Sequence, residues 1–288
     1  MKPKAVWELT RLDHGFMLAL AILIGAIISN KSFYNQYVKL IFAFLTALFL
    51  EASTFSLNDY LDLEIDRKNR RIDRPLVRGD LKPRTALLIF LLLFPMGIIS
   101  SLLVNFNCFI IAIITGIFAI LYDFRIKKIK YIGNFYIAYT TAIPFIFGSV
   151  SVSSRIPYAV LVLAMIAFIA SLGREMMKDI IDIKGDRIGG VRSIPMYIGE
   201  RKTCLTISIL YISAVLLSLL PFLLLKNTTY YFNYAYLAPI LVTDSIFVYL
   251  SVKHVTEKRP PLEKFRRTSL LGMTLGLVAF LLGSILRL

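Results

Sequence analysis

Long apolar blocks constrain this chain more than any other feature of its sequence. A helix needs about 20 mostly apolar residues to cross the hydrocarbon core of a bilayer. Nine blocks approach that length: 14–30, 37–57, 84–105, 107–123, 132–150, 157–177, 204–225, 233–252 and 268–286. Backbone groups inside a bilayer must be satisfied by the segment itself. The sequence therefore predicts an all-α membrane protein, with about nine transmembrane helices that form one bundle.

The basic residues predict the orientation of this bundle. Loops on the cytoplasmic side of a membrane carry an excess of Lys and Arg. With a cytoplasmic N-terminus, 28 of the 33 Lys and Arg residues fall on that side. The formal net charge of +15 is then explained by topology and contact with membrane lipids, and it does not call for a nucleic acid partner. We expect a multi-pass protein of the cell membrane, and the sequence leaves its oligomeric state open.

The polar segments between the blocks are too short for a separate soluble domain, so we expect residues 1–288 to form a single transmembrane domain. Two of these segments are acidic, Asn58–Arg67 and Lys178–Arg187. Each carries three aspartates at i, i+3 and i+7: Asp59, Asp62 and Asp66 in the first, and Asp179, Asp182 and Asp186 in the second. On an α-helix this spacing places the three carboxylates of a set on one face.

Carboxylates that face one way repel each other unless a positive charge lies between them, and oxygen ligands suit magnesium. The predicted topology brings both acidic motifs to the cytoplasmic side, so we expect the six aspartates to form one catalytic centre that binds Mg²⁺. Arg and Lys residues lie around both motifs and suit the phosphate oxygens of a substrate. The candidates for such contacts are Arg67, Arg74, Tyr122, Arg125, Lys127, Arg174 and Lys178. Other cations are expected to anchor loops to anionic lipid instead: Lys82, Arg84, Lys130, Arg201 and those of 258–267.

A magnesium diphosphate beside a lipid-facing helix bundle favours one substrate class, the allylic prenyl diphosphates. Their head is a highly charged leaving group, and their tail is a hydrocarbon. Magnesium and cationic side chains would stabilise the departing diphosphate, and a pocket that excludes water would protect the allylic cation. A hydroxyl group or an electron-rich aromatic carbon would then capture this cation.

The paired motifs resemble the two signature motifs of the UbiA-type membrane prenyltransferases. The resemblance extends over essentially the whole chain, because the nine blocks and the positions of the motifs after the second and sixth block match as well. It implies a single prenyltransferase domain with Mg²⁺-dependent transfer of a prenyl group. By position it also implies five metal ligands, with Asp59 and Asp179 beside them: Asn58, Asp62, Asp66, Asp182 and Asp186.

One position departs from the family pattern. The family has a tyrosine followed four residues later by a lysine, close to the diphosphate. Here Tyr122 is in place, but position 126 is Ile, and the nearest cations are Arg125 and Lys127. The sequence leaves open which of these two cations contacts the diphosphate.

The run from Gly173 to Asp186 is most similar to archaeal members of the family, which add a second geranylgeranyl group to geranylgeranylglyceryl phosphate. This resemblance implies a lipid-phosphate acceptor with a hydroxyl nucleophile, for which the leaving diphosphate could take the proton, so no general base is assigned. Two alternatives within the family stay open, prenylation of an aromatic acid such as 4-hydroxybenzoate and of haem. A distant alternative is an ion transporter, in which the acids would line an ion path.

Overall fold

Helices make up nearly all of the regular structure in the computed structural model, which describes residues 3–12, 15–68, 70–188 and 190–287. The described residues form no strand, only an isolated bridge between Ile129 and Arg192. The elements in the first half of the chain are α1 (Pro3–Thr10), α2 (Gly15–Ser29), η1 (Phe33–Gln36), α3 (Tyr37–Leu61), α4 (Leu63–Lys68), α5 (Pro75–Arg78), α6 (Pro83–Val104) and α7 (Phe106–Phe124). They are followed by η2 (Ile126–Lys128), α8 (Lys130–Val152), α9 (Tyr158–Ile188), α10 (Ile194–Ile198), α11 (Glu200–Leu223), α12 (Tyr234–Thr256) and α13 (Leu262–Ile285).

The predicted membrane spans coincide with long helices. Among the described residues, eight helices are long and apolar enough to cross a bilayer, and the pair α1 and α2 gives a ninth if it counts as one span bent by 52°. The prediction of an all-α membrane protein with about nine spans is therefore confirmed. Residue 14, the predicted start of the first span, lies outside the described residues.

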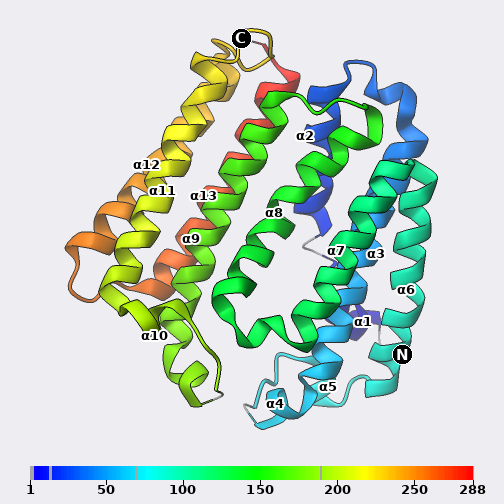
Figure 1. The fold of residues 1–288 in the computed structure, drawn as a ribbon, viewed down its shortest axis with the longest axis vertical. Helices are drawn as coiled ribbons and strands as arrows, with labels where there is room; N and C mark the ends of the chain where they lie inside the picture. Colours follow the sequence, from blue (N-terminus) through cyan, green and yellow to red (C-terminus); the bar gives the residue numbers. More distant parts are fainter. Residues whose placement is uncertain (1–2, 13–14, 69, 189, 288) are drawn as a thin grey trace.

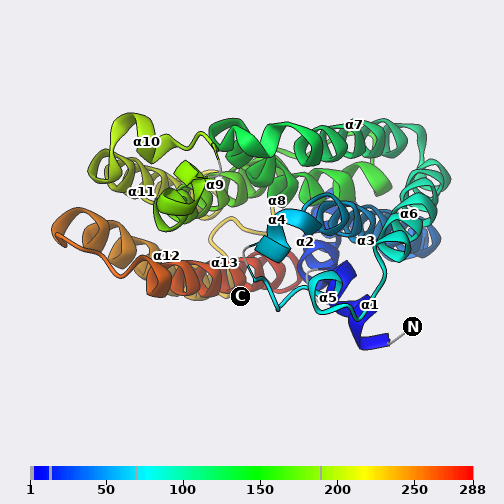
Figure 2. The same ribbon diagram turned by 90° about the horizontal axis from the view of Figure 1, so that it is seen from below.

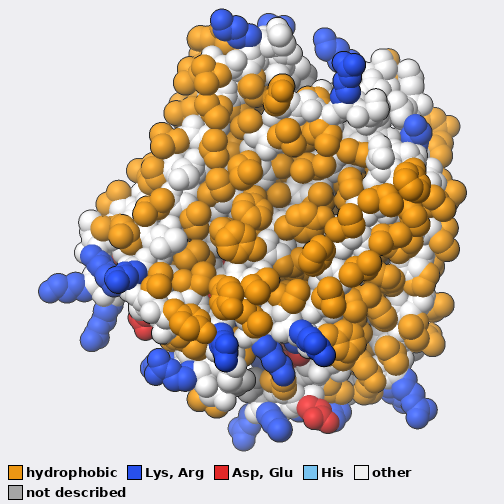
Figure 3. Space-filling model, in the orientation of Figure 1, with side chains coloured by type: hydrophobic (Ala, Val, Ile, Leu, Met, Phe, Trp, Pro, Cys, Tyr) orange, Lys and Arg blue, Asp and Glu red, His pale blue; other side chains and the backbone are white. Residues whose placement is uncertain are grey.

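The long helices run side by side, and the short helices α4, α5 and α10 all lie at the end of the bundle that carries the N-terminus, with α10 apart from the other two (Figure 1). We call this end the polar end; the C-terminus lies at the opposite end. Seen from the polar end, α4 and α8 lie near the middle, with α3, α6 and α7 on one side and α11, α12 and α13 on the other (Figure 2). Hydrophobic side chains cover the middle of the face in Figure 3, and Lys and Arg gather at the polar end.

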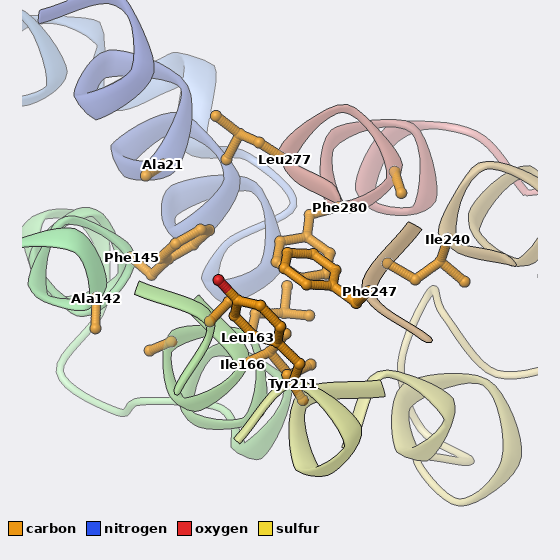
Figure 4. Packing of buried hydrophobic residues seen from close by; sticks show 14 of the residues in the cluster. Ala21, Ala142, Phe145, Leu163, Ile166, Tyr211, Ile240, Phe247, Leu277 and Phe280 are labelled. Atoms are coloured by element: carbon orange, nitrogen blue, oxygen red, sulfur yellow. The ribbon is translucent and has the colours of Figure 1, made fainter. Parts of the chain in front are cut away.

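The main hydrophobic core lies between the pair α2 and α8 and the helices of the C-terminal half of the chain. Side chains from α2, α8, α9, α11, α12 and α13 converge in it, and Figure 4 shows Phe145, Phe247 and Phe280 pointing toward one another. The rings of Phe145 and Phe280 lie 6.0 Å apart in an edge-to-face arrangement, which suits the quadrupoles of aromatic rings. Apolar contacts alone do not drive helices together within lipid, so close packing of this kind carries much of the association.

Two glycines allow α2 and α8 to approach each other very closely. A Cβ atom at Gly25 would lie 2.0 Å from the carbonyl oxygen of Phe145, and one at Gly148 would lie 1.9 Å from that of Ile22. Small residues permit such close approach between transmembrane helices. Ser29 lies one turn after Gly25 on α2, and its hydroxyl donates a hydrogen bond of 2.6 Å to that of Ser149, the residue after Gly148. The contact lies toward the C-terminal ends of both helices, away from the polar end.

Replacement of Gly148 by alanine should separate the two helices. The added methyl group meets backbone rather than a flexible side chain, so we expect a loss of about 1–3 kcal/mol in stability, as for other overpacked sites. The control is Gly185→Ala in α9, where nothing lies within 4 Å of the new Cβ atom. Thermal unfolding in detergent should show a lower Tm for Gly148→Ala alone, and equal Tm values for both variants would contradict the close contact.

Candidate functional site

The first acidic motif lies where α3 gives way to α4. Asp62 ends α3 with φ −88° and ψ −1°, a flattened ψ that departs from regular α-helix geometry. Backbone hydrogen bonds continue through it, from Asp62 N to Asn58 O and from Asp66 N to Asp62 O. The motif therefore extends over the end of α3 and the start of α4, and i→i−4 hydrogen bonds continue through the junction.

Arginine side chains hold two carboxylates of the first motif. The Nη1 atom of Arg74 lies 2.5 Å from Oδ1 of Asp59, and its Nε lies 4.0 Å from Oδ2 of Asp66. Arg11 also contacts Asp59, at 3.3 Å. Burial raises the pKa of Asp66 above its ordinary value, and the charge of Arg71 opposes this. Such burial of carboxylates is costly unless cations accompany them.

The second acidic motif lies on the unbroken helix α9, as the spacing predicted. The Nζ atom of Lys130 lies 2.7 Å from a carboxylate oxygen of Asp186 and 3.5 Å from those of Asp179 and Asp182. The expectation that Lys130 anchors a loop to lipid was therefore wrong, because this side chain is the shared counterion of three acids. Asn134, one turn further along α8, donates a hydrogen bond of 2.7 Å to Asp179.

The loop between α7 and α8 joins the two motifs. Lys127 Nζ lies 2.5 Å from Oδ1 of Asp62 in the first motif. Lys130, three residues later, contacts the aspartates of the second motif. Arg192, in the segment that follows α9, holds the loop through its backbone. Its backbone carbonyl accepts a hydrogen bond from Lys130 N, and its N–H donates one to Lys128 O. Both motifs thus lie at the polar end, and this loop places a cation on each.

Of the other residues predicted to contact phosphate, some line a cavity and some lie at the surface. Tyr122, Arg174 and Lys178 line a large cavity at the polar end. Arg67 and Arg125 are exposed, and within the described part of the chain neither side chain makes an ion pair or a hydrogen bond. Of the two cations beside position 126, the structure thus places Lys127 against the acids and leaves Arg125 at the surface.

A cavity of about 830 Å³ extends from the polar end into the bundle, lined mostly by apolar side chains of α2, α3, α7, α8, α9, α11, α12 and α13. Several residues of the core in Figure 4 form its walls, among them Phe145 and Phe280. A smaller cavity of about 190 Å³ lies between the α7–α8 loop and α9, with Lys127, Lys130 and Asp182 in its wall. Three residues line both cavities: Tyr122, Glu175 and Lys178.

The acids of this site contact cations rather than one another. Within the described ranges, no group of three or more Asp, Glu, His or Cys residues converges on one point in the manner of a finished metal site. Asn58, the remaining predicted ligand, donates through Nδ2 a hydrogen bond of 2.8 Å to Asp123. This hydrogen bond fixes the amide and leaves its carbonyl oxygen, the atom type that binds hard cations, free of that contact.

Sequence reasoning missed five residues of this site: Arg11, Asp123, Lys130, Asn134 and Glu175. A signal existed for two of them, because Glu175 precedes Asp179 by four residues on the same face of α9 and Asn134 follows Lys130 by four on α8. Arg11 precedes the first block and Asp123 ends the fourth, so only the tertiary fold brings them to the acidic motifs.

Comparisons with known proteins agree with this architecture. The sequence profile described as the UbiA prenyltransferase family matches residues 18–271. A digeranylgeranylglyceryl phosphate synthase from Archaeoglobus fulgidus is 42% identical over 282 residues, which cover 98% of this chain and 95% of that protein. One from Methanothrix thermoacetophila is 32% identical, with 96% of this chain and 97% of that protein covered.

Solved structures share the fold. A structure from work on digeranylgeranylglyceryl phosphate synthase in membranes has a TM-score of 0.81 at 32% identity, with 98% of each chain covered. A UbiA homologue from Archaeoglobus fulgidus bound to DMAPP and Mg²⁺ has a TM-score of 0.63 at 18% identity, with 98% of this chain and 99% of that chain covered. Because the family profile matches most of the chain and the identity to these synthases reaches 42%, the chain belongs to the UbiA prenyltransferase family.

Proposed function

We propose that this chain catalyses the Mg²⁺-dependent transfer of a geranylgeranyl group from geranylgeranyl diphosphate to geranylgeranylglyceryl phosphate. The observation that carries the proposal is the junction of a large apolar cavity with a small polar cavity flanked by acids and cations. A prenyl diphosphate combines an apolar chain, which suits the large cavity, with a charged diphosphate, which suits the small one. The synthases similar to this chain over nearly its full length bear the name of this reaction.

We infer that magnesium binds between the acidic motifs. The proposed ligands are Asn58, Asp62, Asp66, Asp182 and Asp186, with Asp59 and Asp179 beside them. Their oxygen atoms are the hard ligands that magnesium prefers. The contacts of Lys127 and Lys130 support a cationic site there, because both motifs attract positive charge. Bound magnesium supplies charge neutralisation of the diphosphate, which makes it a better leaving group.

The lysines and arginines at the polar end are proposed to bind phosphate. Lys127 and Lys130 neutralise the acids in the structure, and a diphosphate carrying its own metal would offer them phosphate oxygens as new partners. Arg174 and Lys178 line the large cavity, where a second lipid bearing a phosphate would place its head. Arg74 bridges Asp59 and Asp66 and is proposed to keep their geometry. The exposed Arg67 and Arg125 are proposed to act at the rim.

The large cavity is proposed to hold prenyl chains and exclude water. Its volume of about 830 Å³ lies toward the upper end of the range of roughly 300–1,000 Å³ for small-molecule sites. Tyr122 and Tyr136 line it beside the small cavity, with ring centroids 5.1 Å apart. Aromatic faces attract cations, so these rings are suited to stabilise positive charge that develops on the allylic carbon.

We propose that the polar end faces the cytoplasm and that the chain acts in the cell membrane as a single domain. The gathering of Lys and Arg at that end supports this orientation, because cytoplasmic loops are enriched in these residues (Figure 3). Both substrates of the proposed reaction are amphipathic, with a prenyl chain suited to the bilayer and a charged head suited to the polar end.

A transfer assay on the purified protein tests the choice of acceptor. Radiolabelled geranylgeranyl diphosphate and Mg²⁺ would be supplied with geranylgeranylglyceryl phosphate or with 4-hydroxybenzoate. We expect a product from the glycerol phosphate alone, because Arg174 and Lys178 place two cations beside the cavity for the acceptor phosphate. A product from the aromatic acid alone would contradict the proposed acceptor.

The proposed metal ligands are tested by Asp62→Asn and Asp182→Asn, which keep the size of each side chain but remove its charge. We expect each variant to lower transfer by about 100-fold or more, the scale seen when a group that stabilises developing charge is lost, while Tm in detergent stays close to wild type. Glu64→Gln is the matched control, because Glu64 lies between two motif acids but is exposed. Normal turnover in both aspartate variants would remove the proposed metal site.

A further inference from the structure

We propose that the Glu175 carboxylate accepts the proton of the acceptor hydroxyl during prenyl transfer. This inference rests on the function proposed above and assigns the base that the sequence left unassigned. In the described part of the chain, Glu175 is the one acidic residue that lines both the large apolar cavity and the small polar cavity. It is 9% exposed, so its carboxylate lies at the junction rather than on the outer surface.

The reacting bond must lie at this junction. The C1 atom of a prenyl diphosphate carries the hydrocarbon chain on one side and the diphosphate on the other. With the chain in the large cavity and the diphosphate against Lys127, Lys130 and Asp182, C1 is placed between them. An attacking oxygen must come within about 3–3.5 Å of C1, so the hydroxyl proton is released where the two cavities meet.

The contacts of Glu175 leave one carboxylate oxygen for this task. Its Oε1 lies 2.5 Å from Lys178 Nζ and 3.5 Å from Arg174 Nη1. Within the described ranges, no ion pair or hydrogen bond engages its Oε2. Both cations lie beside Oε1, so Oε2 is the oxygen that can accept the proton of the acceptor hydroxyl. A weak base suffices, because the hydroxyl becomes strongly acidic as its oxygen bonds to an allylic cation.

Other acids in the cavity walls are placed less well for this step. Asp123 accepts a hydrogen bond from Asn58 and lines the large cavity alone. Glu51 and Asp244 also line only the large cavity, and Oδ2 of Asp244 accepts a hydrogen bond from Ser218. Asp179 and Asp182 contact Lys130 and belong to the proposed metal site.

In the proposed step, one bond to C1 forms as another breaks. The acceptor hydroxyl oxygen forms a bond to C1, and the C1–oxygen bond to the diphosphate breaks with its electron pair on the leaving group. The hydroxyl proton moves to the carboxylate of Glu175. The products are the ether, free diphosphate and a protonated Glu175, which then returns its proton to water.

The test separates proton removal from cleavage of the C1–oxygen bond. Glu175→Gln removes the base but keeps a side-chain oxygen that can accept a hydrogen bond from Lys178. Transfer from geranylgeranyl diphosphate to geranylgeranylglyceryl phosphate would be measured with Mg²⁺. Cleavage alone would be followed as positional isotope exchange in bridge-labelled ¹⁸O geranylgeranyl diphosphate, in the presence of an acceptor analogue that lacks the reacting hydroxyl. Glu200→Gln is the control, because Glu200 is an exposed acid at the start of α11.

We expect Glu175→Gln to lower kcat for transfer by about 10²–10⁴-fold, the usual contribution of a positioned base, with isotope exchange and KM close to wild type. Equal loss of exchange and transfer would overturn the proposal and leave Glu175 as a residue that positions Lys178. Unchanged transfer would also overturn it and make the leaving diphosphate the proton acceptor. A wild-type protein that exchanges isotope but does not prenylate this acceptor would contradict the proposed function instead, and the assigned base with it.

Discussion

Repulsion among carboxylates is the constraint on which the arrangement of this site depends. Six aspartates lie at one end of a bundle that is otherwise apolar, and the fold brings cations to them from distant parts of the chain. Arg74 contacts two acids of the first motif. Lys130 contacts all three of the second. All of these aspartates except the exposed Asp182 are buried or half-buried, and carboxylates in such places are costly without cationic partners.

The α7–α8 loop occupies the central place in this arrangement. It carries Lys127 and Lys130, and backbone hydrogen bonds to Arg192 hold it against the segment that follows α9. One short loop therefore supplies a counterion to each of the two acidic motifs. The same lysines face the small cavity, so the groups that stabilise the fold without substrate are also the groups positioned to bind phosphate.

Most of the fold was accessible from the sequence because lipid imposes a simple rule. Apolar blocks of sufficient length must be helices, so the predicted spans coincide with long helices. The helical spacing also predicted correctly that Asp179, Asp182 and Asp186 share a face of α9. The cations that contact the first motif were not predictable from spacing, because Arg11, Arg74 and Lys127 meet these acids only in the tertiary fold. Lys130 was misread for the same reason, since a lysine at a helix end looks like a lipid anchor until its partners are known.

We propose that Lys127 and Lys130 hold the acidic motifs until a metal-bound diphosphate takes their place. The most direct test is a structure determined with Mg²⁺ and a non-cleavable thiolo analogue of geranylgeranyl diphosphate. We expect metal density beside Asp62, Asp66, Asp182 and Asp186, with the Nζ atoms of both lysines moved onto phosphate oxygens. Lysine–aspartate distances that stay at 2.5 Å for Asp62 and 2.7 Å for Asp186, with the diphosphate bound elsewhere, would contradict it.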